Sequence, residues 1–237
     1  MLLFMPKHVK INKEDFKYNK YIVKDLLSIS IPTTGSRFIG SISYFLEPII
    51  LSFVLLSVGY SNQYITFEYG VINGYVFPIL LLPSFFTMAI SNALLPVVSN
   101  SYSHRNYTYT KSKIKQAIMF SLLIGIPCTL IFIFIPEVPL KFIYNTTLGI
   151  NYIKIIAPFF ILHYIQAPLT STLLAIGKAK DSMYGTLIGS IIRTILLGVI
   201  SYLKVGIWGL IIASISNVLF VTIHHIYYVN KYLKKEY

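Results

Sequence analysis

Six long apolar segments constrain this chain more than any other feature of its sequence. They span residues 26–58, 71–98, 114–136, 152–176, 183–203 and 206–229. A helix crosses the bilayer core with about 20 consecutive apolar residues, whereas a transmembrane barrel would show short segments of alternating polarity. A soluble domain is excluded as well, because only 12% of the 237 residues are charged and the mean hydropathy is +0.69. The sequence therefore predicts an all-α, polytopic membrane protein built as a six-transmembrane-helix bundle.

The basic residues that give the chain its net charge of +12 gather in alternate loops. Nucleic-acid binders carry such charge on a polar domain, but here it lies between apolar segments, so nucleic acid is not an expected partner. If the N-terminus is cytoplasmic, the outer segments hold only Lys141, Lys154 and Lys204. The inner segments hold Lys7, Lys10, Lys13, Lys17, Lys20, Lys24, Arg105, Lys111, Lys113, Lys115, Lys178, Lys180, Lys231, Lys234 and Lys235. The positive-inside rule then predicts a multi-pass plasma-membrane protein with both termini in the cytoplasm.

The same pattern divides the chain into three parts. Residues 1–24 form a basic cytoplasmic lead, residues 25–229 a six-helix transmembrane lobe, and residues 230–237 a basic cytoplasmic tail.

No catalytic constellation is visible in the sequence. It contains no glycine-rich phosphate loop, no Cys or His metal spacing and no Ser-centred elbow. We therefore predict no enzymatic activity, catalytic residue, cofactor or metal. His163 lies within the fourth segment, where it is either a proton relay or a histidine hydrogen-bonded to a neighbouring helix. The pair His224-His225 near the end of the last segment is interpreted as an interfacial polar anchor.

Apart from Lys115 and Lys154 at the very starts of their segments, three charged residues lie inside the apolar segments, namely Arg37, Glu47 and Arg193. Charge is costly in hydrocarbon, so each should face a watery cavity or an oppositely charged partner. Arg37 and Glu47 are about 15 Å apart along an ideal helix, and Arg37 is close enough to the start of its segment to snorkel. Arg193 lies deeper. It either binds substrate or forms a structural ion pair, for which Glu47 is the candidate partner on depth alone.

Additional polar side chains lie in the segments, among them Asn73, Asn92, Gln166 and Asn217. Hydrogen bonding between helices is their simplest role. Most segments are also interrupted by Pro or Gly, and broken helices around a polar interior are typical of a transporter. The candidate substrate-binding residues are Arg37, Glu47, Asn92, Gln166 and Arg193.

Three passages carry a family resemblance. They are LLSISIPTTGSR at residues 26–37, Leu82-Pro83 continuing through AISNALLPVVS at residues 89–99, and LLAIGKAK at residues 173–180. Their order and spacing resemble the second half of polysaccharide-export flippases. The Pro and following Arg of the first passage look like the sporulation protein B branch of that family.

The resemblance implies membership of the superfamily that joins multidrug and toxin extrusion proteins, polysaccharide exporters and lipid II flippases. Its members have two six-helix lobes that rock about a central cleft in alternating access. This chain matches one lobe, so the resemblance implies a fragment, a split subunit or a degraded copy, completed by a missing half or by a second copy of itself.

Three functions are considered. The first is flipping of a lipid-linked oligosaccharide or polysaccharide precursor, with Arg37 and Arg193 binding its pyrophosphate and the lipid tail remaining in the bilayer. The alternatives are a cation-coupled multidrug exporter, for which Glu47 is the available carboxylate, and an inactive fragment or membrane scaffold. The expected partners are the lipid-linked sugar, membrane lipids and a second six-helix lobe.

The loop charges predict the orientation of the chain. In a variant lacking the single Cys128, Ser103→Cys should be protected from an impermeant thiol reagent added outside the cell, and Asn145→Cys should react. The reverse labelling pattern would contradict the orientation.

Overall fold

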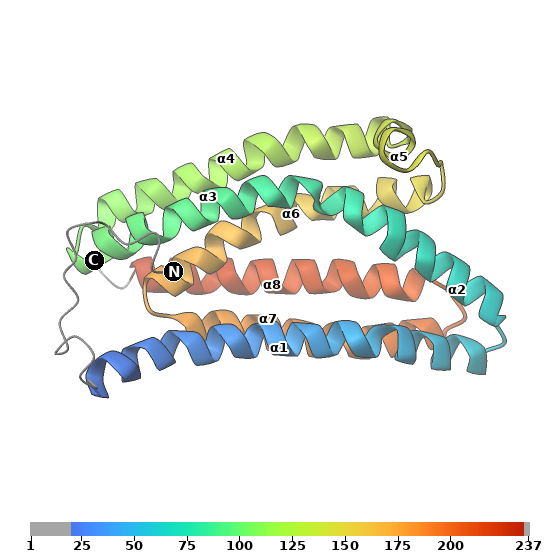
Figure 1. Ribbon diagram of the computed structural model, residues 1–237, viewed down its shortest axis with the longest axis horizontal. Coiled ribbons are helices and arrows are strands. Elements are labelled where there is room, and N and C mark those ends of the chain that lie inside the picture. Colours follow the sequence, from blue (N-terminus) through green and yellow to red (C-terminus); the bar gives the residue numbers. More distant parts are fainter. Residues whose placement is uncertain (1–19, 235–237) are drawn as a thin grey trace, which may run out of the picture.

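The computed structural model describes residues 20–234, and these residues are helical almost throughout (Figure 1). The elements are α1 (Lys20–Ser57), α2 (Asn62–Val71), the π-helix η3 (Ile72–Val76), α3 (Phe77–Ser103), α4 (Tyr107–Phe134), α5 (Glu137–Tyr144), α6 (Ile150–Ala175), α7 (Ala179–Tyr202) and α8 (Trp208–Lys234). In the described part of the chain, six helical stretches are long and apolar enough to cross a membrane. The predicted fold class is confirmed.

The second membrane-spanning stretch begins earlier than the apolar pattern predicts. It runs from Asn62 to Ser103, because α2, η3 and α3 continue one another without a break. A positive φ of 98° at Gly59 turns the chain after α1. The hydroxyl of Ser61 then accepts a hydrogen bond from the Tyr64 backbone N–H at 3.2 Å and caps α2. These local signals start a helix nine residues before the apolar run at residue 71.

The predicted lead and tail overlap the helices. Helix α1 begins at Lys20 and α8 ends at Lys234, so residues 20–24 and 230–234 are helical. The remaining residues of the lead, 1–19, and of the tail, 235–237, lie outside the described residues. The cytoplasmic position of both segments stays a prediction.

The helices form two layers. Helices α1, α7 and α8 pack together as one layer, and α3, α4 and α6 form the other, while the main contact between the layers is α6 on α8. Figure 1 shows α1 and α7 along the lower edge, α3 and α4 above, and α8 between them. Helix α1 meets the second layer chiefly through α2. The bodies of α1 and α3 are therefore held apart over much of their length.

Close packing within the layers depends on glycine at a few positions. A Cβ at Gly125 of α4 would lie 2.6 Å from the ring of Tyr164, which is fully buried and donates its hydroxyl to the Leu80 carbonyl at 2.7 Å. Gly185 and Gly189 likewise bring α7 against α8, where added Cβ atoms would lie 2.6 Å from His224 and Val221, respectively. The equally spaced pair Gly70 and Gly74, by contrast, faces open space.

The glycine contacts predict opposite responses to one substitution. Gly125→Val should destabilise the protein by about 1 to 3 kcal/mol, because the new side chain overpacks against a buried ring. The matched control Gly70→Val meets no atom within 4 Å of its Cβ and should leave stability nearly unchanged. Thermal unfolding in detergent measures both, and equal melting temperatures for the two variants would contradict the packing described.

Candidate functional site

A cavity of about 420 Å³ lies between the two layers. One wall is α1 and the opposite wall is η3 with the start of α3, while α6, α7 and α8 close it from behind. Its volume falls in the range of small-molecule sites, about 300 to 1,000 Å³. The lining residues are Gly40, Ser43, Tyr44, Asn73, Phe77, Pro78, Leu81, Phe160, His163, Gln166, Thr186, Ser190, Arg193, Ser214, Asn217, Val218 and Val221.

Local sequence features shape the two walls. On α1, Gly40, Ser43 and Tyr44 follow helical spacing, so small and polar residues share the face toward the cavity. On the opposite wall, the wider turn of η3 ends just before Pro78, and such π segments are frequent at functional sites. The Asn73 amide of η3 donates to the Tyr69 carbonyl of α2 at 3.3 Å.

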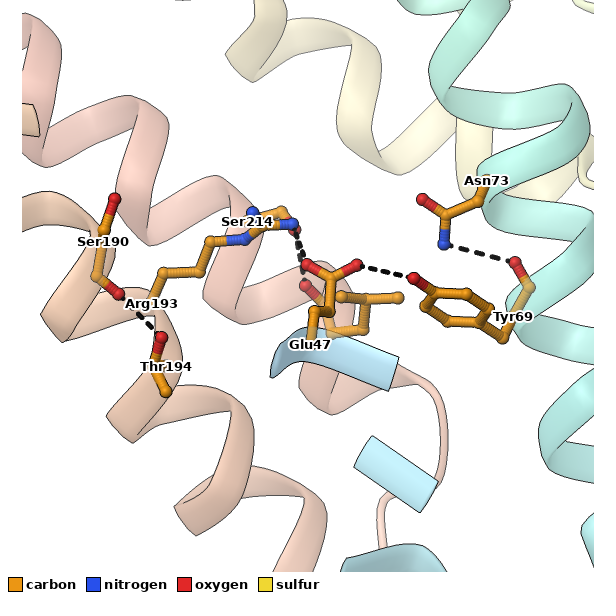
Figure 2. A network of polar contacts seen from close by, with 8 residues as sticks. Glu47, Tyr69, Asn73, Ser190, Arg193, Thr194 and Ser214 are labelled. Carbon is orange, nitrogen blue, oxygen red and sulfur yellow. Dashed lines mark hydrogen bonds and ion pairs between the residues drawn. The ribbon is translucent and has the colours of Figure 1, made fainter. Parts of the chain in front are cut away.

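A buried ion pair between Glu47 of α1 and Arg193 of α7 lies beside the cavity (Figure 2). Glu47 is 3% exposed and Arg193 is 8% exposed. The carboxylate also accepts a hydrogen bond from the Tyr69 hydroxyl at 3.4 Å, and the guanidinium donates to the Ser214 hydroxyl at 3.4 Å. The ring of Tyr44 lies 4.7 Å from the guanidinium carbon, in cation–π range. This network joins α1, α2, α7 and α8 at one point.

The ion pair leaves part of the guanidinium without a partner. Within the described chain, Nε of Arg193 is buried and makes no hydrogen bond. Arg193 lines the cavity, whereas Glu47 does not. The pairing inferred from depth is therefore present, and a role for Arg193 in substrate binding stays a prediction.

Of the other three candidate residues, one lines the cavity and two do not. Gln166 lines the cavity and donates from its amide to the Val218 carbonyl at 3.1 Å and to the Thr222 hydroxyl at 2.8 Å. Arg37 and Asn92 are exposed and lie outside the cavity lining. Arg37 lies two helical turns before Tyr44 on the same side of α1, which places it near the rim of the cavity.

The structure adds residues that the charges alone did not select. Tyr44 and Tyr69 contact the ion pair, and Ser190 and Ser214 line the cavity. Helical spacing was the available signal for Tyr44, which lies three residues before Glu47. Tyr69 lies in α2, beyond the turn that follows α1, and no sequence signal linked it to Glu47.

The interpretation of the histidine pair was wrong for His225. This residue of α8 is 2% exposed and packs against α6 and α7. Its Nδ1 lies 3.4 Å from the Thr170 hydroxyl and its Nε2 lies 3.5 Å from the Ser182 hydroxyl. An interfacial anchor would face headgroups and water. The helices that cover α8 determine this burial, and the sequence of α8 alone does not reveal it.

A model of the MatE family matches residues 72–200, which is more than half of the chain. The chain belongs to the MatE family. The matched range runs from η3 through most of α7 and includes Gln166 and Arg193.

Similar proteins extend the MatE match over nearly the whole chain. Stage V sporulation protein B of Bacillus subtilis (strain 168) is 35% identical over 232 residues, which cover 96% of this chain and 45% of that protein. Sporulation protein YkvU of the same organism is 23% identical over 229 residues, covering 96% of this chain and 50% of that protein. The crystal structure of MATE in the bent conformation has a TM-score of 0.81 at 17% identity, covering 96% of this chain and 49% of that one.

This MatE chain therefore spans about half the length of the curated relatives it matches. The structural likeness confirms that the described residues have the fold of one MATE lobe. That it corresponds to the second of the two lobes stays a prediction. Family membership supports the expectation that the chain is not an enzyme.

The ion pair predicts how the lobe responds to single and double substitutions. Arg193→Ala should destabilise the protein by about 3 to 5 kcal/mol, because it leaves the Glu47 carboxylate buried without compensation. Arg193→Ala combined with Glu47→Ala should recover much of that loss. Thermal unfolding in detergent and the yield of folded protein provide the measurements.

Arg37→Ala is the control for the pair, since it removes the same side chain from an exposed position on α1. It should change stability by no more than about 0.5 kcal/mol. If the double variant were as unstable as Arg193→Ala, the carboxylate would not be the cause.

Proposed function

We propose that this chain is one six-helix half of a two-lobe transporter that flips a lipid-linked oligosaccharide or polysaccharide precursor by alternating access. The observation that carries the proposal is a cavity lined by both polar and apolar side chains, with one guanidinium in its wall, inside a MatE lobe. The cavity receives the headgroup while the lipid tail stays in the bilayer. The 35% identity to a sporulation protein supports a role in sporulation.

The charge of the cavity supports this substrate over a cationic drug. None of the described residues that line the cavity is an Asp or a Glu. The nearby carboxylate of Glu47 is already paired with Arg193. A cation exporter needs a carboxylate free to receive its substrate or coupling ion, so the wall favours an uncharged, hydroxyl-rich group over a cation.

A purely structural role fits the cavity poorly. A scaffold gains stability by filling its interior, whereas here polar groups from five elements converge on an open volume. Their convergence supports binding of a ligand that forms many hydrogen bonds.

The second lobe follows from alternating access. One lobe supplies one wall of a cleft, and a transporter requires two walls that rock against each other. Six spans return the chain to the side from which it starts, so a second lobe can pair with it in the same orientation. The partner is either the missing half or a second copy of this chain.

Reconstitution tests the proposal. Vesicles containing paired lobes should move a fluorescent polyprenyl-pyrophosphate sugar between leaflets, measured by quenching with a membrane-impermeant reductant. Vesicles containing strictly monomeric chain should show no movement above protein-free vesicles. A control variant is Lys154→Ala, which changes an exposed residue at the start of α6. Paired lobes carrying this substitution should flip the lipid at the unmodified rate.

Two results would contradict the proposal. Flipping by a strictly monomeric chain would remove the requirement for a second lobe. Failure of both the self-paired chain and the chain paired with a complementary lobe to flip this lipid would remove the substrate class.

A further inference from the structure

We infer that the cavity binds the uncharged sugar of the substrate, and that the pyrophosphate is bound outside it, at Arg37 on the rim. This division rests on the proposed function and assigns parts of the substrate to different residues. It also gives Arg193 the role of a hydrogen-bond donor in the cavity wall and not that of the phosphate-binding cation.

Charge balance within the cavity is the first argument. Among the described lining residues, Arg193 alone carries a permanent charge, and Glu47 neutralises it in a buried pair. A pyrophosphate placed beside Arg193 would also lie beside that carboxylate. It would either suffer like-charge repulsion or displace Glu47 and leave it buried and unpaired, which is costly.

The hydrogen-bonding groups left free around the cavity are the second argument. Within the described chain, the hydroxyls of Ser43 and Ser190 and the amide of Asn217 make no hydrogen bond to protein, and neither does Nε of Arg193. Figure 2 shows that the main-chain carbonyl of Ser190 accepts a hydrogen bond from the Thr194 hydroxyl. The hydroxyl of Ser190 itself is left available. Together these groups offer neutral donors and acceptors and one buried N–H without a partner, the set that sugar hydroxyls and acetamido groups match.

Aromatic rings in the cavity are the third argument. Tyr44, Phe77 and Phe160 line it from α1, α3 and α6. Phe77 and Phe160 stack with their ring centroids 6.3 Å apart. Rings interleaved with polar groups suit a pyranose, which has an apolar face and a rim of hydroxyls. A compact polyanion such as pyrophosphate gains nothing from such surfaces.

Arg37 offers what a pyrophosphate needs and the cavity does not supply. It is exposed, and it lies two turns before Tyr44 on the same side of α1, about 10 Å along the helix axis. A guanidinium binds phosphate oxygens bidentately. A sugar in the cavity therefore leaves the attached pyrophosphate near the rim and the lipid tail free to remain in the bilayer.

Two lipids separate the roles of these residues. The first probe is a polyprenyl pyrophosphate bearing one N-acetylhexosamine, and the second is the same polyprenyl pyrophosphate without a sugar. Binding of each is measured with the full chain in nanodiscs. The cavity is formed by residues of this chain, so binding is measurable without a second lobe.

Asn217→Leu should weaken binding of the sugar-bearing lipid by about three- to tenfold, the effect of losing hydrogen bonds between neutral groups, and leave binding of the bare lipid unchanged. Arg37→Gln should weaken both lipids equally, by about tenfold, because it removes a charge-assisted contact to the part they share. The matched control Asn230→Leu makes the same substitution at an exposed site on α8 and should change neither.

Ser43→Ala provides a second cavity variant with little risk to folding, since it removes one hydroxyl from α1. It should weaken only the sugar-bearing lipid, by about threefold. Equal weakening of both lipids by Asn217→Leu and Ser43→Ala, or no effect of Arg37→Gln on the bare lipid, would overturn the division.

These outcomes are separate from failure of the proposed function. If the unmodified chain binds the sugar-bearing lipid and paired lobes flip it, but the cavity variants do not distinguish the two probes, the division alone is wrong. If the unmodified chain binds neither probe, the substrate class and the division both fail.

Discussion

The ion pair between Glu47 and Arg193 is the interaction on which the rest of this lobe depends. A lone charge near the centre of a bilayer costs about 2.5 to 3.5 kcal/mol on insertion scales. Each residue compensates the other, and hydrogen bonds from Tyr69 and to Ser214 complete the network. Because the pair joins the first, second, fifth and sixth spans, satisfying two charges also determines how α1 lies against α7.

The two-layer arrangement turns this constraint into a cavity. Helix α1 is held to α7 and meets the other layer chiefly through α2, while α6 and α8 join the layers behind. The space between α1 and α3 is then lined by whatever residues these helices turn inward. Two apolar clusters support the cavity from its two ends along the helices. One includes Leu51 and Ile79, and the other includes Val98 and Leu173.

The sequence predicted the features that follow from the length of the apolar segments and from the depth of charged residues within them. Six spans followed from segment length, and the partner of Arg193 followed from depth, because hydrocarbon penalises charge regardless of topology. The start of α2 depended on a single capping serine within a polar stretch. The contrast between Gly185, packed on α8, and Gly70, facing open space, depends on which helices become neighbours, and identical spacing carries no information about that. The exposure of Asn92 and the burial of His225 were hidden for the same reason.

The separation of Glu47 and Arg193 along the chain has a consequence for synthesis at the membrane. The ribosome adds about 5 to 20 residues per second, so the roughly 150 residues between them take about 7 to 30 s. During that interval the first span is complete while the span that will neutralise it does not yet exist. The nascent chain must therefore keep Glu47 protonated, hydrated or shielded by the insertion machinery until the fifth helix arrives.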